Sequence, residues 1–135
     1  YLYRPATEQE QTPRIVINVR IGNFQSAAFI DTGGVYLVCP TEVADALNLQ
    51  PASVLFRDRV LLRGRLIAGS VYRLPLTFIA GEGASLMIEA TTFIPDRERL
   101  EWDDFPCILG MQGCLERLCF AVDPMNETFY FGEPI

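Results

Sequence analysis

One acidic residue, Asp31, stands directly behind an apolar run and ahead of two glycines, in the stretch SAAFIDTGGVYLVCP. An ionised carboxylate at the end of a buried strand is costly unless a partner satisfies it. Gly33 has no Cβ, so the chain can turn sharply there and bring a backbone N–H close to the carboxylate. The stretch therefore predicts a tight turn between two strands that displays Asp31 on a rigid support.

The segments on either side of this turn show the alternation of apolar residues that is typical of half-buried strands. Residues 14–21 and 25–30 flank the turn signal Gly22-Asn23, which predicts a hairpin that ends at Asp31. Further hairpin strands are expected at residues 54–62 with 66–74, 74–80 with 85–94, and 119–123 with 128–131. Short strands are expected at residues 36–39 and 107–110. The pattern indicates a mostly β domain, closed or sandwich-like.

Two short helices complete this expectation. The first covers residues 41–47, with Val43, Ala46 and Leu47 on its inner face, and ends near Asn48. The second covers residues 111–118. Both are short, so the strands determine the fold class.

The charge balance and the absence of histidine exclude several functions. The chain has 17 acidic residues against 11 basic ones, a formal charge of −6 and no His. This balance argues against a nucleic-acid partner, and Ser-His-Asp and Cys-His catalysis are excluded within the chain. Four cysteines have neither the spacing nor the histidine companions of a zinc site, so we expect no metal and no other cofactor. We interpret them as buried free thiols: Cys39, Cys107, Cys114 and Cys119.

The first thirteen residues differ from the rest in composition. They are polar and contain two prolines, so we expect residues 1–13 to be an arm or linker and residues 14–135 to be a single domain. No stretch is apolar for long enough to span a bilayer, and no signal peptide opens the chain. We expect a cytoplasmic protein with no direct membrane segment. Whether the domain belongs to a longer precursor stays open.

Asp31-Thr32-Gly33 behind two apolar residues resembles the active-site turn of the retropepsins, the single-domain aspartic proteases. The order of the surrounding elements resembles the same family. A hairpin precedes the turn, a short helix ending in Asn48-Leu49 follows it, and a hairpin around Gly64 stands where the family has its flap. Ile108-Leu109-Gly110 resembles the segment near the family's C-terminus. The resemblance covers about residues 14–132 and implies a retropepsin-like closed β-barrel of acid-protease type with one or two short helices.

The resemblance implies an aspartic endopeptidase that acts as a homodimer on a peptide or protein substrate. Two Asp31 carboxylates, one per chain, would share one proton and activate a water molecule. No other acid of the chain has the same apolar-run, tight-turn context, so the second carboxylate has to come from a second copy. Thr32 and Gly33 are implied as the scaffold of this catalytic pair. Structural residues beside it are Ile108, Leu109 and Gly110, and substrate contacts are implied for Gly34, Arg63, Gly64, Arg65, Leu66 and Ile67.

The sequence departs from the retroviral pattern at two paired positions. Retroviral members carry an acid and an arginine that pair near the dimer interface, and here these positions hold Val35 and Met111. A dimer of this chain must therefore be held differently. Two alternatives stay open: a catalytically weak or inactive retropepsin-like fold that serves as a peptide-binding or dimerisation module, and an unrelated β domain in which Asp31 only forms a turn.

Overall fold

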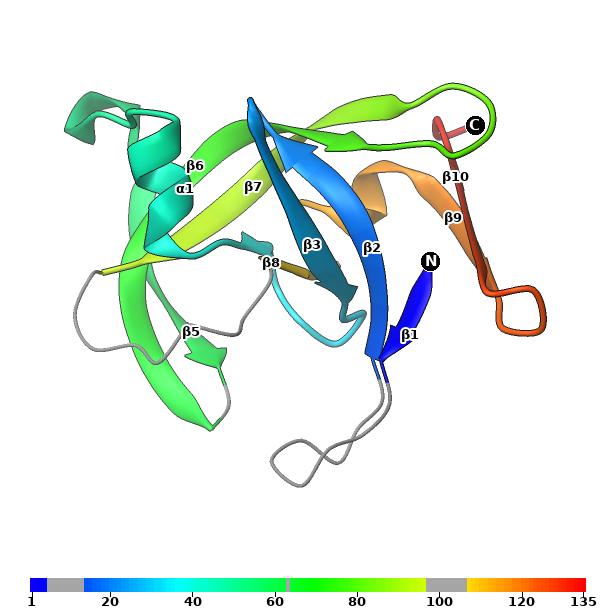
Figure 1. The fold of residues 1–135 in the computed structure, drawn as a ribbon. Helices are drawn as coiled ribbons and strands as arrows, with labels where there is room; N and C mark the ends of the chain where they lie inside the picture. The colour runs from blue at the N-terminus through cyan, green and yellow to red at the C-terminus, as the bar shows by residue number, and fades with distance from the viewer. Residues whose placement is uncertain (5–13, 63, 97–106) are drawn as a thin grey trace.

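The computed structural model describes residues 1–4, 14–62, 64–96 and 107–135 (Figure 1). Strands dominate these ranges: β1 (Leu2–Arg4), β2 (Arg14–Ile21), β3 (Phe24–Ile30), β4 (Leu37–Val38), β5 (Phe56–Leu62), β6 (Arg65–Phe78), β7 (Leu86–Pro95), β8 (Cys107–Leu109), β9 (Cys119–Asp123) and β10 (Thr128–Gly132). The helices are short: α1 (Thr41–Ala46) and the 3₁₀ helices η1 (Pro51–Ser53) and η2 (Leu115–Arg117). None of the helices within these ranges is long and apolar enough to cross a membrane.

The main sheet closes on itself. The order of its strands is β1, β2, β3, β8, β4, β7, β6 and β5, and β6 pairs again with β2. At this seam, residues 19–21 of β2 lie antiparallel to residues 76–78 of β6. β9 and β10 form a separate hairpin beside the barrel (Figure 1). The predicted mostly β fold with a closed barrel is confirmed.

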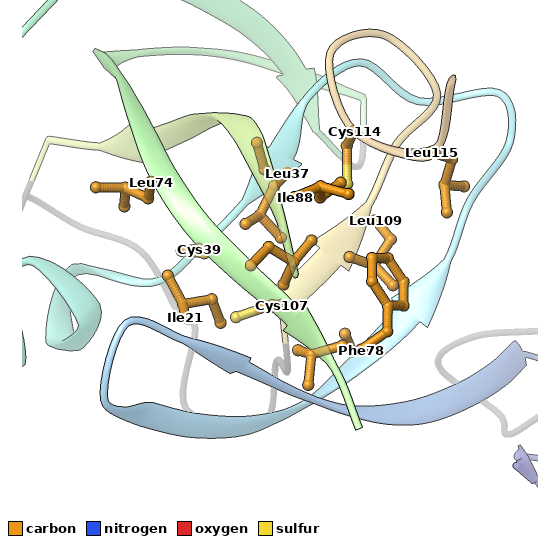
Figure 2. Packing of buried hydrophobic residues seen from close by; sticks show 14 of the residues in the cluster. Ile21, Leu37, Cys39, Leu74, Phe78, Ile88, Cys107, Leu109, Cys114 and Leu115 are labelled. Carbon is orange, nitrogen blue, oxygen red and sulfur yellow. The ribbon is translucent and has the colours of Figure 1, made fainter. Parts of the chain in front are cut away.

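The inside of the barrel holds the larger hydrophobic cluster. Fully buried side chains reach it from several walls, among them Ile21, Leu37, Leu76, Phe78 and Leu109. Figure 2 shows such side chains converging from strands that lie far apart in the sequence. The Phe78 ring also lies 5.6 Å from that of Phe131 in β10, centroid to centroid, which attaches the separate hairpin to the barrel. Each fully buried aliphatic side chain contributes about 2 kcal/mol, so this cluster stabilises the closed form.

Helix α1 packs against the core of the barrel, and its prediction is confirmed with one exception. It ends before Asn48, whose φ of +51° is incompatible with further helix. Val43 is buried and Leu47 packs against the core, as expected. Ala46 is exposed, so its inward placement is wrong, and Ala44 packs against the core instead. Residues 43, 44 and 47 lie on the same face of a helix, and residue 46 lies outside that face.

The helix predicted over residues 111–118 is wrong, because only the single 3₁₀ turn η2 forms there. Gly113 interrupts the segment with a φ of +70°. Its carbonyl accepts a hydrogen bond from the Thr91 N–H of β7 at 2.8 Å, and a Cβ at this position would lie 2.5 Å from Thr91 Oγ1. The backbone therefore approaches β7 too closely for a helix to continue through it.

Strand β6 is a single strand of 14 residues, so the division into separate strands near residue 74 is wrong. Pro75 does not end it. Pairing with β2 begins only at Leu76, and the Pro75 carbonyl accepts a hydrogen bond from the Gly22 N–H at 2.9 Å. A proline fits a strand where its missing N–H is not needed by the neighbouring strand.

All four cysteines are free thiols, and three of them are buried as expected: Cys39, Cys107 and Cys114. Burial raises the pKa of Cys114 to about 12, so this thiol stays protonated. Cys119 is exposed, and its predicted burial is wrong. It opens β9, whose two-stranded hairpin leaves alternate side chains in solvent.

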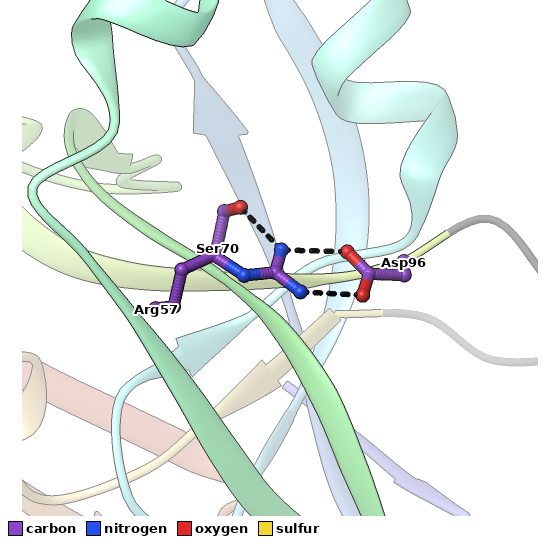
Figure 3. A network of polar contacts seen from close by, with 3 residues as sticks. All are labelled: Arg57, Ser70 and Asp96. Atoms are coloured by element: carbon purple, nitrogen blue, oxygen red, sulfur yellow. Dashed lines mark hydrogen bonds and ion pairs between the residues drawn. The ribbon is translucent and has the colours of Figure 1, made fainter.

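One polar network ties the outer strand β5 to its neighbours (Figure 3). The Arg57 guanidinium donates to both carboxylate oxygens of Asp96, at 2.7 and 2.6 Å, and to Ser70 Oγ of β6 at 2.9 Å. These bonds hold the pKa of Asp96 below its usual range. The network links β5 and β6 to the end of β7.

Truncation of a leucine tests which positions form the core of the barrel. We expect Leu76→Ala, at a fully buried position, to lower the free energy of unfolding by about 2–5 kcal/mol, because it removes contacts and leaves a cavity. The matched variant Leu55→Ala, at a position 52% exposed, should cost less than about 1 kcal/mol. Chemical denaturation measures both, and equal losses would contradict the assignment of the core.

The Arg57–Asp96 pair predicts a pH dependence of stability. The lowered pKa of Asp96 means that its contribution is present above the unfolded pKa, near pH 4, and is lost as the pH falls through the folded pKa. Asp96→Asn should therefore be slightly less stable than the unmodified chain at pH 7, and the difference should shrink as the pH falls below about 4. Both partners are about half exposed, so the difference is small. Melting temperatures measured across this pH range test the prediction.

Candidate active site

The loop that carries Asp31 follows β3 and is hydrogen-bonded to β8. Ile30 lies opposite Leu109 in a parallel pairing, and the Asp31 N–H donates to the Leu109 carbonyl at 2.9 Å. The Gly34 N–H then donates to the Asp31 carbonyl at 3.0 Å, which closes a tight turn. The backbone of Asp31 is thus fixed on both sides.

The Asp31 side chain is half-buried, and one backbone donor faces it. The Gly33 N–H donates to Asp31 Oδ1 at 3.2 Å. A Cβ on Gly34 would lie 3.2 Å from Oδ2, so the glycine leaves that side of the carboxylate open. Thr32 is exposed. Within the part of the chain that the structure describes, the hydrogen-bond donor to this carboxylate is the Gly33 N–H.

Strand β8 lies between β3 and β4, although these two strands are neighbours in the sequence. It runs parallel to β3 and antiparallel to β4. Past its end, the Gly110 N–H donates to the Tyr36 carbonyl at 2.8 Å and the Met111 N–H to the Gly34 carbonyl at 2.9 Å. A Cβ on Gly110 would lie 2.5 Å from the Tyr36 carbonyl oxygen. The loop over residues 31–36 therefore packs directly against the backbone of Gly110, which has no side chain to separate the two segments.

The β5–β6 hairpin packs beside this loop through a second hydrophobic cluster. Its buried members are Tyr36, Val38, Val60, Val71 and Phe93. Ile67 of the hairpin and Ile108 of β8 pack against the same cluster. The cluster thus joins the hairpin to the two strands next to the Asp31 loop.

The turn of the β5–β6 hairpin carries the other predicted substrate contacts. Leu66 is 63% exposed and, by alternation with Ile67, lies on the other face of the hairpin. Gly64 and Arg65 are exposed at the turn, and Arg63 lies outside the described residues. Among the residues described, no hydrogen bond or ion pair links the turn to residues 31–34.

One contact at this site escapes a sequence-based search. The Tyr36 hydroxyl donates to Asp58 Oδ2 of β5 at 2.8 Å, and the Tyr36 ring meets that of Phe56 edge to face. Tyr36 reads as an ordinary strand residue and Asp58 as one of several charged residues on a hairpin. No local sequence pattern therefore marks this pair.

Solved structures with a similar fold include two from the retropepsin group. A retropepsin-like aspartic protease from Rickettsia conorii is 17% identical, with a TM-score of 0.53, over 90% of this chain and 83% of that one. This chain has the retropepsin-like fold. The retroviral protease-like domain of Ddi1 from Leishmania major is 16% identical, with a TM-score of 0.51, over 87% of this chain and 86% of that one. No protein-family model and no curated protein sequence matches the chain.

The retropepsin-like fold confirms the resemblance that the sequence suggested, and at these identities the likeness is one of fold. Val35, at the position where retroviral members carry an acid, is 37% exposed and forms a bridge with Gln112. The described residues contain no group of three or more His, Cys, Asp and Glu side chains that could hold a metal ion.

A single methyl group at position 110 tests how the Asp31 loop is held. We expect Gly110→Ala to lower the free energy of unfolding by about 1–3 kcal/mol, because the added Cβ collides with the backbone of residues 34–36 and neither side can yield. Gly81→Ala is the matched control, since a Cβ there meets nothing within 4 Å. Thermal denaturation compares the two. A Gly110→Ala protein as stable as Gly81→Ala would show that the loop does not rest on β8.

Proposed function

We propose that residues 14–135 are an aspartic endopeptidase domain that works as a homodimer, with one Asp31 from each chain. The observation that carries the proposal is the position of Asp31. Its DTG turn is held by the inserted strand β8 in a retropepsin-like fold, with the carboxylate half-buried and accessible. A residue that only formed a turn would need neither the inserted strand nor an open side chain.

The homodimer follows from the need for two carboxylates. Two acids at hydrogen-bonding distance cannot both ionise, so they share one proton and take different roles. One chain supplies a single Asp31, and exposed Thr32, Gly33 and Val35 surround it. A second copy on a two-fold axis through this surface would bring in the second carboxylate and cover these residues.

The proposed reaction needs only the two carboxyl groups and water. The ionised carboxylate takes a proton from a bound water, and the water oxygen forms a bond to the peptide carbonyl carbon. The protonated carboxyl gives its proton to the carbonyl oxygen, which yields a tetrahedral diol. The carboxyl that took the proton from water then gives it to the amide nitrogen. As the C–N bond breaks, the other carboxylate takes a proton back from the diol, and a carboxylic acid and an amine leave. No bond forms between protein and substrate.

The peptide would lie between the β5–β6 hairpin, acting as a flap, and the Asp31 loop. An extended segment can bind there through strand-like backbone hydrogen bonds, with alternate side chains entering pockets. Ile108 and Ile67 line the second cluster beside the loop and stay partly accessible. This composition favours apolar side chains in the substrate next to the scissile bond.

Replacing the proposed catalytic acid tests the function. We expect Asp31→Asn to lower the rate of cleavage of an unfolded protein substrate by at least about 100-fold, because an amide can neither take nor give the proton. The variant should keep its melting temperature and its dimeric state, measured by sedimentation. Glu82→Gln, in the exposed loop between β6 and β7, is the control that keeps full activity.

The outcomes separate the alternatives. Cleavage that persists in Asp31→Asn, or a strictly monomeric protein without cleavage between about pH 4 and 7, would contradict the proposal. A folded dimer that binds peptides but cleaves none would point to a binding or dimerisation module. A large loss of stability in Asp31→Asn would assign the residue to the turn alone.

A further inference from the structure

Tyr36 has an unusual backbone for a large aromatic residue. Its φ is +60°, in the left-handed region that costs free energy for any residue with a bulky side chain. Both of its backbone groups are bound: the N–H donates to the Gln112 carbonyl at 3.0 Å, and the carbonyl accepts from the Gly110 N–H at 2.8 Å. Such an outlier persists only where the surroundings fix it, and outliers of this kind gather at functional sites.

In this conformation, the Tyr36 side chain points from the Asp31 loop towards strand β5 of the hairpin. The side chain is 7% exposed and belongs to the second cluster. Its hydroxyl donates to Asp58 Oδ2 at 2.8 Å, and its ring centroid lies 6.5 Å from that of Phe56 at an interplanar angle of 67°. Burial and the neighbouring Asp58 raise the pKa of Tyr36, so the phenol stays protonated and remains a donor.

The acceptor is itself fixed. Asp58 Oδ1 accepts a hydrogen bond from the Arg59 N–H at 2.7 Å, which leaves Oδ2 for the tyrosine. A hydrogen bond to a charged acceptor is stronger and more directional than one between neutral groups. Asp58 thus sets the position of β5 relative to Tyr36.

Closer to the turn, the described side chains hold the hairpin by apolar contacts and not by a directional hydrogen bond. The side chains of Val60, Leu62 and Ile67 pack in the second cluster through apolar contacts, which have no preferred direction. On the opposite face, Arg57 binds Asp96 and Ser70 (Figure 3). Among the described side chains, the Tyr36–Asp58 bond is the polar link between the hairpin and the loop.

From this geometry we propose that Tyr36 is a positioning residue, which couples the placement of the β5–β6 hairpin to the loop that carries Asp31. The hairpin would then already have a fixed position relative to the Asp31 carboxylates when a peptide binds. The peptide would not have to order it. The effect on catalysis rests on the proposed function, whereas the effect on the hairpin does not.

The test removes one hydroxyl. In Tyr36→Phe, hydrogen exchange of the amides in β5 and in residues 65–68 should accelerate about tenfold, while exchange in β2 and β3 stays unchanged. kcat/KM for a peptide should fall about tenfold, mainly through a higher KM, because the hairpin has to be ordered on binding. Tyr130→Phe is the matched control, since it removes a hydroxyl from a side chain that is 55% exposed on β10, and it should match the unmodified protein in both measurements.

Asp58→Ala removes the acceptor of the same bond and serves if Tyr36→Phe does not fold. The double variant should be no worse than either single variant, because all three lack one shared interaction. Unchanged hairpin exchange in both single variants, or additive effects in the double variant, would overturn the proposal. Faster exchange in a protein that cleaves nothing would support the positioning role and contradict the proposed function instead.

Discussion

The close approach of Gly110 to the backbone of residues 34–36 is the contact on which the rest of this structure depends. Hydrogen bonds from Gly110 and Met111 reach the carbonyls of Tyr36 and Gly34, and a side chain at residue 110 would prevent both. This approach lets β8 lie between β3 and β4. It extends the contact between β8 and the loop beyond the Leu109 carbonyl, which accepts the hydrogen bond of the Asp31 N–H.

The same loop links three parts of the molecule that lie far apart in the sequence. Asp31 takes its position from β8, while Tyr36 extends the loop into the hairpin through Asp58. The left-handed backbone of Tyr36 costs about 1–2 kcal/mol. Burial of its ring and the hydrogen bond to a carboxylate each contribute a similar amount, which is enough to offset this cost. The proposed chemistry and the proposed positioning of the hairpin thus have a common structural origin.

Much of this arrangement could be predicted from the sequence, because local patterns determine it. The alternation in residues 14–30 and the turn at Gly22-Asn23 define the hairpin that ends at Asp31. The apolar run before Gly110 marked the inserted strand. Features fixed by tertiary contacts could not be predicted: the Gly113 carbonyl bound by Thr91 stops a helix, and the Tyr36–Asp58 bond joins residues 22 positions apart. The substrate contacts expected at the hairpin turn, Gly64 among them, stay predictions.

The central claim is that each site takes one Asp31 from each of two chains, and a mixing experiment tests it most directly. Unmodified chain and Asp31→Asn are combined at constant total concentration and allowed to exchange subunits, and cleavage is followed against the fraction of unmodified chain. If both carboxylates are needed, mixed dimers are inactive and activity falls with the square of that fraction. Activity that falls in direct proportion to the fraction would show that one chain holds a complete site and would contradict the account.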